Sequence, residues 1–192
     1  MIGKLAAVAV SVAALFAASG ASAQKLSDDV VKIGVLTDMS GVYSDFAGQG
    51  AVTAAKMALE DYLARPGAKL AKKVEIISAD HQNKADIAAN LARTWYERDK
   101  VDAIVELVGT AVALAAMEVA DQKGKITLLS GPASLPITNE KCTATNVQWT
   151  YDTYALSNGT AKAVVDSGKK NWYFLAADYA FLYPFSQRSE DV

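Results

Sequence analysis

The chain has 192 residues and a formal net charge of −2, with 19 Lys and Arg against 21 Asp and Glu. This even balance argues against a nucleic-acid binder, which concentrates basic residues on one face. The length allows one domain, or one domain and part of another.

The first 23 residues have the pattern of a cleaved export signal. Lys4 is followed by an apolar run over residues 5–18 and by the small residues Ala21-Ser22-Ala23. A membrane anchor is the alternative, but it needs about 20 apolar residues to cross the bilayer. We therefore expect cleavage after Ala23, a mature chain that begins at Gln24, and a periplasmic location.

The next part of the chain alternates between β-branched runs and amphipathic stretches. This order predicts an α/β fold, an open parallel sheet with helices on both faces, because β-α-β crossovers are right-handed. Strands are predicted at residues 30–37, 74–78, 102–107 and 126–129, and helices at 50–64, 84–98 and 110–123.

Two of these helices have a predicted inner face. In the first it is formed by Val52, Ala55, Leu59 and Tyr62. In the second, Asn83 is the expected N-cap, and the inner face is formed by Ile87, Leu91, Thr94 and Trp95.

An irregular stretch over residues 130–148 follows, then a predicted helix at 151–167 and a strand at 171–176. We expect an N-terminal α/β lobe over 24–148, and a crossover with an incomplete second lobe over 149–192.

Three loops follow predicted strands, at residues 38–44, 108–111 and 130–134. Each combines a small residue with a hydroxyl, and ligands of open α/β sheets bind beyond the carboxyl ends of the strands. The first two loops lead towards helix N-termini, which attract anions. The pattern is compatible with a carboxylate site without Arg or Lys, and equally with ordinary turns and N-caps.

A nucleotide-dependent enzyme of the Rossmann type is a competing interpretation. Gly48-Gln49-Gly50 is part of a dinucleotide-binding motif, and Asp80 ends a strand where a ribose ligand would lie. The glycines come too long after Thr37 for the tight turn that the motif requires. No catalytic residue, metal site or cofactor is therefore predicted.

The single histidine and the single cysteine do not indicate a catalytic or metal site. His81 is the only histidine, and a surface or capping role is expected for it. Cys142 is the only cysteine, and it is either a buried inert thiol or paired with a cysteine outside this sequence.

Several segments carry a family resemblance, namely VKIGVLTDMSGVYSDFAGQGAVTAAKMALEDY, ISADHQNKAD, LLSGPASLPIT, VQWTYDTYALSNGTAKAVV and FLAADYAF. Over residues 31–181 the chain resembles periplasmic binding proteins of the branched-chain amino acid (leucine/isoleucine/valine) type, which serve ABC importers. After Phe181 the sequence departs from the family pattern, with Leu182 for glycine and then Pro184. We read this as a changed reading frame or the end of a fragment.

The resemblance implies a type I periplasmic binding fold, here the first lobe plus the start of the second, that closes on an amino acid or related small carboxylate. It implies an ABC permease as the membrane partner. A sensor domain of the same fold is the alternative. Because much of the second lobe is absent, we expect the chain alone to bind its solute weakly. The implied ligand-binding residues are Tyr43, Thr110, Ala111, Pro132, Ala133, Ser134, Trp149, Tyr151 and Phe181.

Overall fold

The computed structural model describes residues 30–68, 73–169, 171–173 and 175. The predicted export signal over 1–23 and the predicted ligand residue Phe181 lie outside the described residues. The elements are β1 (Val30–Thr37), α2 (Gly48–Leu63), β2 (Lys73–Asp80), α3 (Ala85–Glu97), β3 (Ala103–Glu106), α4 (Thr110–Gln122), β4 (Ile126–Leu129), the 3₁₀ turn η1 (Leu135–Ile137), β5 (Asn146–Gln148) and α5 (Thr153–Asp166).

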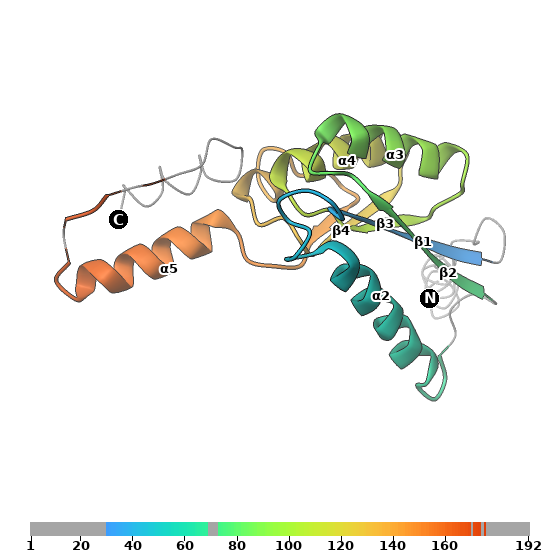
Figure 1. Ribbon diagram of the computed structural model, residues 1–192, viewed down its shortest axis with the longest axis horizontal. Helices are drawn as coiled ribbons and strands as arrows, with labels where there is room; N and C mark the ends of the chain where they lie inside the picture. The colour runs from blue at the N-terminus through green and yellow to red at the C-terminus, as the bar shows by residue number, and fades with distance from the viewer. Residues whose placement is uncertain (1–29, 69–72, 170, 174, 176–192) are drawn as a thin grey trace, which may run out of the picture.

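The strands form one parallel sheet in the order β2-β1-β3-β4-β5. Helices α3 and α4 cover one face, and α2 lies on the other (Figure 1). This confirms the predicted open parallel sheet with helices on both faces. Strand β5 was not predicted, because its three residues, Asn146, Val147 and Gln148, have no run of β-branched residues.

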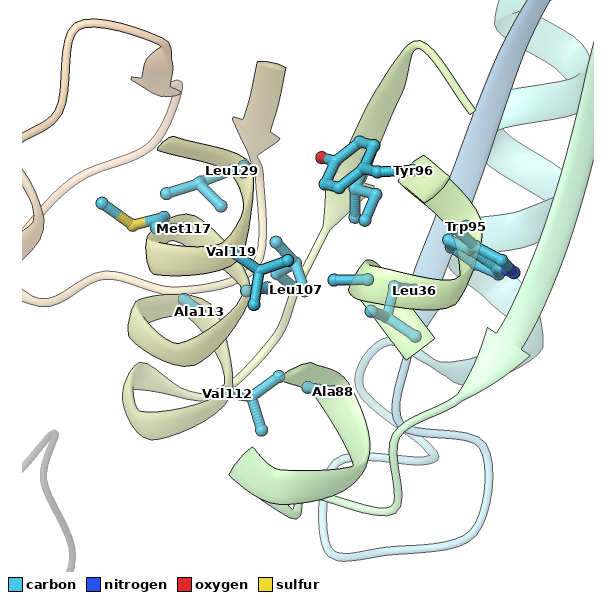
Figure 2. Packing of buried hydrophobic residues seen from close by; sticks show 14 of the residues in the cluster. Leu36, Ala88, Trp95, Tyr96, Leu107, Val112, Ala113, Met117, Val119 and Leu129 are labelled. Atoms are coloured by element: carbon cyan, nitrogen blue, oxygen red, sulfur yellow. The ribbon is translucent and has the colours of Figure 1, made fainter. Parts of the chain in front are cut away.

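The hydrophobic core lies between the sheet and the α3–α4 pair (Figure 2). Leu36 from β1, Ile104 from β3 and Leu129 from β4 are completely buried there. Alternate residues of a strand point to opposite faces, so Ile33 and Val35 line the α2 side instead. The sheet is therefore apolar on both faces, as in parallel sheets with helices on each side.

The predicted inner face of α2 is confirmed. Val52 is buried, and Ala55, Leu59 and Tyr62 are half-buried, while most other residues of the helix are exposed.

The predicted inner face of α3 is only partly right. Trp95 is buried as predicted, together with Ala88, Ala92 and Tyr96, whereas the predicted Ile87, Leu91 and Thr94 are half-buried. Small alanines at the contact allow the close approach of α3 to α4, so the helix turns its smaller side chains inwards.

The expected N-cap of α3 is wrong. Lys84 occupies that position, and Asn83 precedes it with a φ of 53°. Asparagine adopts this left-handed conformation more readily than most residues, so Asn83 forms the turn rather than the cap.

Asp152 is the N-cap of α5, and its side chain accepts a hydrogen bond from the Ala155 amide at 2.8 Å. The helix extends away from the sheet (Figure 1). In the predicted strand over 171–176, the described residues 171–173 and 175 are not in a strand, so that prediction is wrong for them. The boundary between lobes at residue 148 stays a prediction.

Cys142 is exposed and free. The expectation of a buried thiol is therefore wrong, because the segment around it is a surface turn between η1 and β5. Within the described residues, no helix is both long enough and apolar enough to cross a bilayer.

Candidate ligand-binding site

The strand order places a crevice at the carboxyl ends of β1 and β3. The chain leaves β1 towards β2 on one side of the sheet, and leaves β3 towards β4 on the other. Loops that diverge from neighbouring parallel strands leave room between them, and ligands of open α/β sheets bind at this point.

A cavity of about 300 Å³ opens at this crevice. It collects residues from the loops after β1, β3, β4 and β5, which are far apart in sequence. Its lining residues are Tyr43, Phe46, Val108, Gly109, Thr110, Gly131, Pro132, Ala133 and Tyr151.

Five of the predicted ligand residues thus line one cavity, namely Tyr43, Thr110, Pro132, Ala133 and Tyr151. Three other predicted residues within the described chain do not line it. Ala111 is exposed on α4, Ser134 is completely buried, and Trp149 is 83% exposed outside the cavity.

The loop after β1 is held by the buried carboxylate of Asp38. Its Oδ1 accepts a hydrogen bond from the Gly41 amide at 2.6 Å, and its Oδ2 accepts one from the Tyr43 amide at 2.9 Å. A side chain at Gly41 would collide with this carboxylate, since a Cβ there would lie 2.6 Å from Oδ1. Asp38 therefore fixes the backbone that presents Tyr43 to the cavity.

Asp80 braces the same loop from the end of β2. Its carboxylate accepts hydrogen bonds from the Met39 amide, the Ser40 hydroxyl and the Gln82 amide, at 2.9, 2.6 and 2.8 Å. Although burial raises the pKa of this carboxyl, these hydrogen bonds hold the pKa below its ordinary value. The carboxylate is thus engaged by the protein's own loop, which argues against the ribose-binding role considered for a Rossmann enzyme.

The expected surface role of His81 is wrong, because its side chain is completely buried. Its Nδ1 accepts a hydrogen bond from the Asn83 amide at 3.0 Å, so the expected capping of local backbone does occur. Burial lowers the pKa of His81, against the opposing charges of Asp38 and Asp80. The imidazole is therefore neutral and structural near pH 7.

The N-terminus of α4 opens into the cavity. Gly109 is its N-cap with a φ of 96°, a conformation that favours glycine, and no side chain of the described residues caps the helix. Thr110 is 5% exposed, and its Oγ1 has no hydrogen-bond partner among the described residues. The first amides of a helix also lack partners within the helix. These donors and the helix dipole are suited to an anion.

The segment that carries Tyr151 is tied to the loop after β4. The Thr150 hydroxyl donates to the Pro132 carbonyl at 3.2 Å, and the Leu135 amide donates to the Thr153 hydroxyl at 3.2 Å. These bonds hold the start of the α5 segment beside the cavity, which explains how Tyr151 reaches a site built by distant loops.

Sequence reasoning missed four lining residues. Val108, Gly109 and Gly131 belong to the predicted loops, but they carry no hydroxyl or aromatic group that would single them out. Phe46 lies just beyond the first loop, and it is 70% exposed in the structure. The signal available in the sequence was an aromatic residue in the loop between a predicted strand and a predicted helix.

No group of three or more His, Cys, Asp or Glu side chains in the described part of the chain is arranged to hold a metal ion. The cavity lining itself contains no charged side chain among the described residues.

A family model described as periplasmic binding protein matches residues 30–191. Comparison with the curated proteins gave no match. A periplasmic binding protein from Burkholderia mallei is 45% identical, with a TM-score of 0.78, over 85% of this chain and 43% of its own. A branched-chain amino acid ABC transporter periplasmic ligand-binding protein from Burkholderia xenovorans LB400 is 32% identical, with a TM-score of 0.72, over 84% and 42%.

A solute-binding protein of an ABC transporter from R. palustris, solved with 4-hydroxybenzoate, shares the fold at 24% identity and a TM-score of 0.69, over 84% of this chain and 44% of its own. The chain therefore spans less than half the length of each of these proteins.

Proposed function

This chain belongs to the periplasmic binding protein family, and from that premise we propose that it receives a small carboxylate in the periplasm for an ABC importer. The family is a solute-binding type rather than an enzyme type. The proposed ligands are amino acids or related small carboxylates, and the proposed partner is the importer's membrane permease. The described residues would supply one wall of the ligand site.

The observation that carries this proposal is the buried hydroxyl of Thr110 at the uncapped start of α4. Thr110 lines the cavity, and its Oγ1 is buried without a partner among the described residues; leaving a buried hydroxyl unpaired costs about 1–3 kcal/mol. A ligand carboxylate placed there would accept from this hydroxyl and from the first amides of α4. The cavity therefore offers an anion site built from dipoles instead of a cation.

The rest of the cavity suits an apolar or aromatic ligand body. Tyr43, Phe46 and Tyr151 contribute rings, and Pro132 and Ala133 contribute small apolar surfaces. The volume of about 300 Å³ is at the lower end for small-molecule sites. This combination favours a compact carboxylate with a flat or branched apolar body.

The described lining offers little to a ligand amine. No acid is among the described lining residues, although Asp45 is exposed in the same loop as Tyr43. Asp38 and Asp80, which support that loop, already accept hydrogen bonds from the protein. On this wall we therefore propose that the carboxylate and the apolar body are recognised, while an amine is not.

The test is a titration of the ¹⁵N-labelled full chain with benzoate, followed through the amide signals of Thr110, Ala111 and Val112. We expect benzoate at millimolar concentration to shift these signals, and its uncharged analogue benzamide to leave them unchanged. Equal shifts with both compounds would contradict an anion site at α4.

A matched pair of variants separates the hydroxyl from general effects. Thr110→Val is expected to weaken benzoate binding about tenfold or more, since a hydrogen bond to a charged group contributes about 1.5–3 kcal/mol. Thr138→Val removes an exposed hydroxyl that bonds Leu135 outside the cavity, and it should leave binding unchanged. Unaltered binding in Thr110→Val would count against the proposed anchor.

The amine is tested with leucine and 4-methylpentanoate, which differ only by the amino group. We expect similar shifts from both. Clearly tighter binding of leucine would show that this wall does recognise an amine.

A further inference from the structure

A buried acid lies behind the ligand cavity without lining it. Glu106, the last residue of β3, is 5% exposed. Its side chain does not line the ligand cavity, but lines the space under α2 together with Ser130. A buried acid is costly unless it makes compensating contacts, so its contacts indicate what it does.

The carboxylate of Glu106 holds the loop between β3 and α4 (residues 107–109). Its Oε2 accepts a hydrogen bond from the Val108 amide at 2.9 Å. This loop has a strained backbone, with φ of 83° at Glu106 and 60° at Leu107. Such conformations cost about 1 kcal/mol or more at a residue other than glycine, so the hydrogen bond offsets part of that strain.

Glu106 also joins this loop to the loop after β4. The Gly131 amide donates to the Glu106 carbonyl at 3.2 Å, and a Cβ at Gly131 would overlap the carboxylate Oε1. Val108, Gly109 and Gly131 all line the ligand cavity. One acid therefore sets the relative position of two of the loops that form the site.

The surroundings of Glu106 place its ionisation near neutral pH. Burial raises its pKa to about 7, the Val108 hydrogen bond and the neighbouring Thr37 hydroxyl lower it, and the charge of Asp38 raises it. Asp45, on the loop before α2, is exposed and lines an adjoining cavity with Glu106. The segment after β4 adds Ser130 and Gly131, which do not titrate.

We propose that Glu106 is a positioning residue for the ligand-binding loops, and that its charge makes the binding of an anionic solute depend on pH. This rests on the proposed function. Both the neutral and the ionised carboxyl can accept from the Val108 amide, so the loop keeps its position in either state. The ionised form, however, adds a negative charge behind a site that receives an anion.

The repulsion has a predictable size. Two unit charges about 10 Å apart, at an effective dielectric constant of about 20, change affinity by on the order of tenfold. An anionic ligand is therefore expected to bind about fivefold more tightly at pH 6 than at pH 8, since the bound anion keeps Glu106 partly protonated at pH 8. Benzoate remains ionised over this range, so its own charge does not account for the change. Burial lowers the pKa of His81, and the Glu106→Gln variant separates protonation of His81 from that of Glu106.

The experiment first follows the Val108 amide signal of the full chain without ligand from pH 5 to pH 9. Wild type should show an inflection near pH 7, which Glu106→Gln removes and the control Asp45→Asn keeps. Absence of the inflection in wild type, or its persistence in Glu106→Gln, would overturn the inference whether or not any ligand binds.

Benzoate is then titrated at pH 6 and pH 8. Glu106→Gln keeps an oxygen that can accept from Val108 but carries no charge, so it should bind equally at both pH values, with about the affinity of wild type at pH 6. Glu106→Leu lacks an acceptor and should bind weakly at both. If Glu106→Gln retains the wild-type pH dependence, the inference fails while the proposed function stands. If benzoate binds no variant at either pH, the proposed function fails, and the free-chain titration still decides the role of Glu106.

Discussion

The two faces of the sheet differ in how completely they are covered. On the α3–α4 face, Ile104 and its neighbours in the core are completely buried. On the α2 face, Ile126, Leu128 and Val147 remain 45%, 41% and 44% exposed, and a cavity of about 420 Å³ lies between α2 and the sheet. Burial of apolar surface is the main source of stability, so the described domain is stabilised chiefly by its α3–α4 face.

This difference also divides the ligand site. Thr110 begins α4, in which Val112 and Ala113 are part of the core. Packing therefore holds the part of the site around Thr110. Tyr43 precedes α2, the less buried helix, and its loop depends on the hydrogen bonds of Asp38. We therefore expect the part of the site around Thr110 to be rigid. The part around Tyr43 should respond more to the loss of the hydrogen bonds that hold its loop.

The strongest test compares one aliphatic side chain from each face. Ile104→Ala should lower the free energy of unfolding by about 3 kcal/mol, since truncating a buried aliphatic residue typically costs about 2–5 kcal/mol. Leu128→Ala, on the adjacent strand but on the α2 face, should cost less than about 1 kcal/mol, because much of that side chain is already in water. Urea unfolding followed by circular dichroism measures both. Equal losses would show that the two faces contribute alike.

A second test uses the buried acid under α2. The pKa of Glu106 is raised from 4.5 to about 7 in the folded chain, so between these values the folded state binds more protons than the unfolded state. Its contribution to stability is therefore full below about pH 4.5, and it is lost as pH rises through about 7. With about 1.4 kcal/mol for each pKa unit, the loss is at most about 3 kcal/mol.

Comparing wild type and Glu106→Gln by urea unfolding from pH 5 to pH 8 isolates this contribution. Wild type should lose stability relative to the variant as pH rises. A constant difference between the two proteins across this range would contradict the raised pKa.

The sheet and its layers were predictable because their signals are strong. β-branched runs such as residues 30–37 can be recognised without any tertiary information, and helix periodicity between them gives the order of elements. The inner face of α3 was predicted correctly only at Trp95, because Ala88 and Ala92 carry little hydrophobic signal and are buried for their small size. Strand β5 was missed because it joins the sheet through backbone pairing with β4, not through an apolar pattern of its own.

The sequence predicted which loops form the site, but not which of their side chains line the cavity. Strand ends locate Tyr43 and Thr110, since parallel strands end at a common edge of the sheet. The same rule gives no information on side-chain direction, so Ser134 is buried beside a cavity that it does not line. Glu106 was not singled out, because an acid at a strand end looks like a solvated residue until its burial is known.

A third test concerns the closest packing on the α3–α4 face. A Cβ at Gly34 on β1 would overlap the Trp95 ring on α3. Gly34→Ala should therefore lower the free energy of unfolding by about 2 kcal/mol, within the range of about 1–3 kcal/mol for overpacking. In the Trp95→Leu background the same change should cost clearly less, because the ring is gone. Additive losses in the double variant would show that the two residues do not compete for space.

The smallest effect is expected outside both faces, at Cys142 in the surface turn before β5. Its thiol is exposed and free, and the hydrogen bond that Sγ donates to the Thr143 carbonyl, at 3.7 Å, is long and weak. Surface substitutions of this kind usually change stability by less than about 0.5 kcal/mol, so Cys142→Ser should leave the urea midpoint unchanged. The native thiol should also react with a thiol reagent such as DTNB nearly as fast as in urea-unfolded chain. Slow labelling of the native protein, or a clear loss of stability in Cys142→Ser, would mean that this turn is packed against other parts of the chain and belongs to the folded core after all.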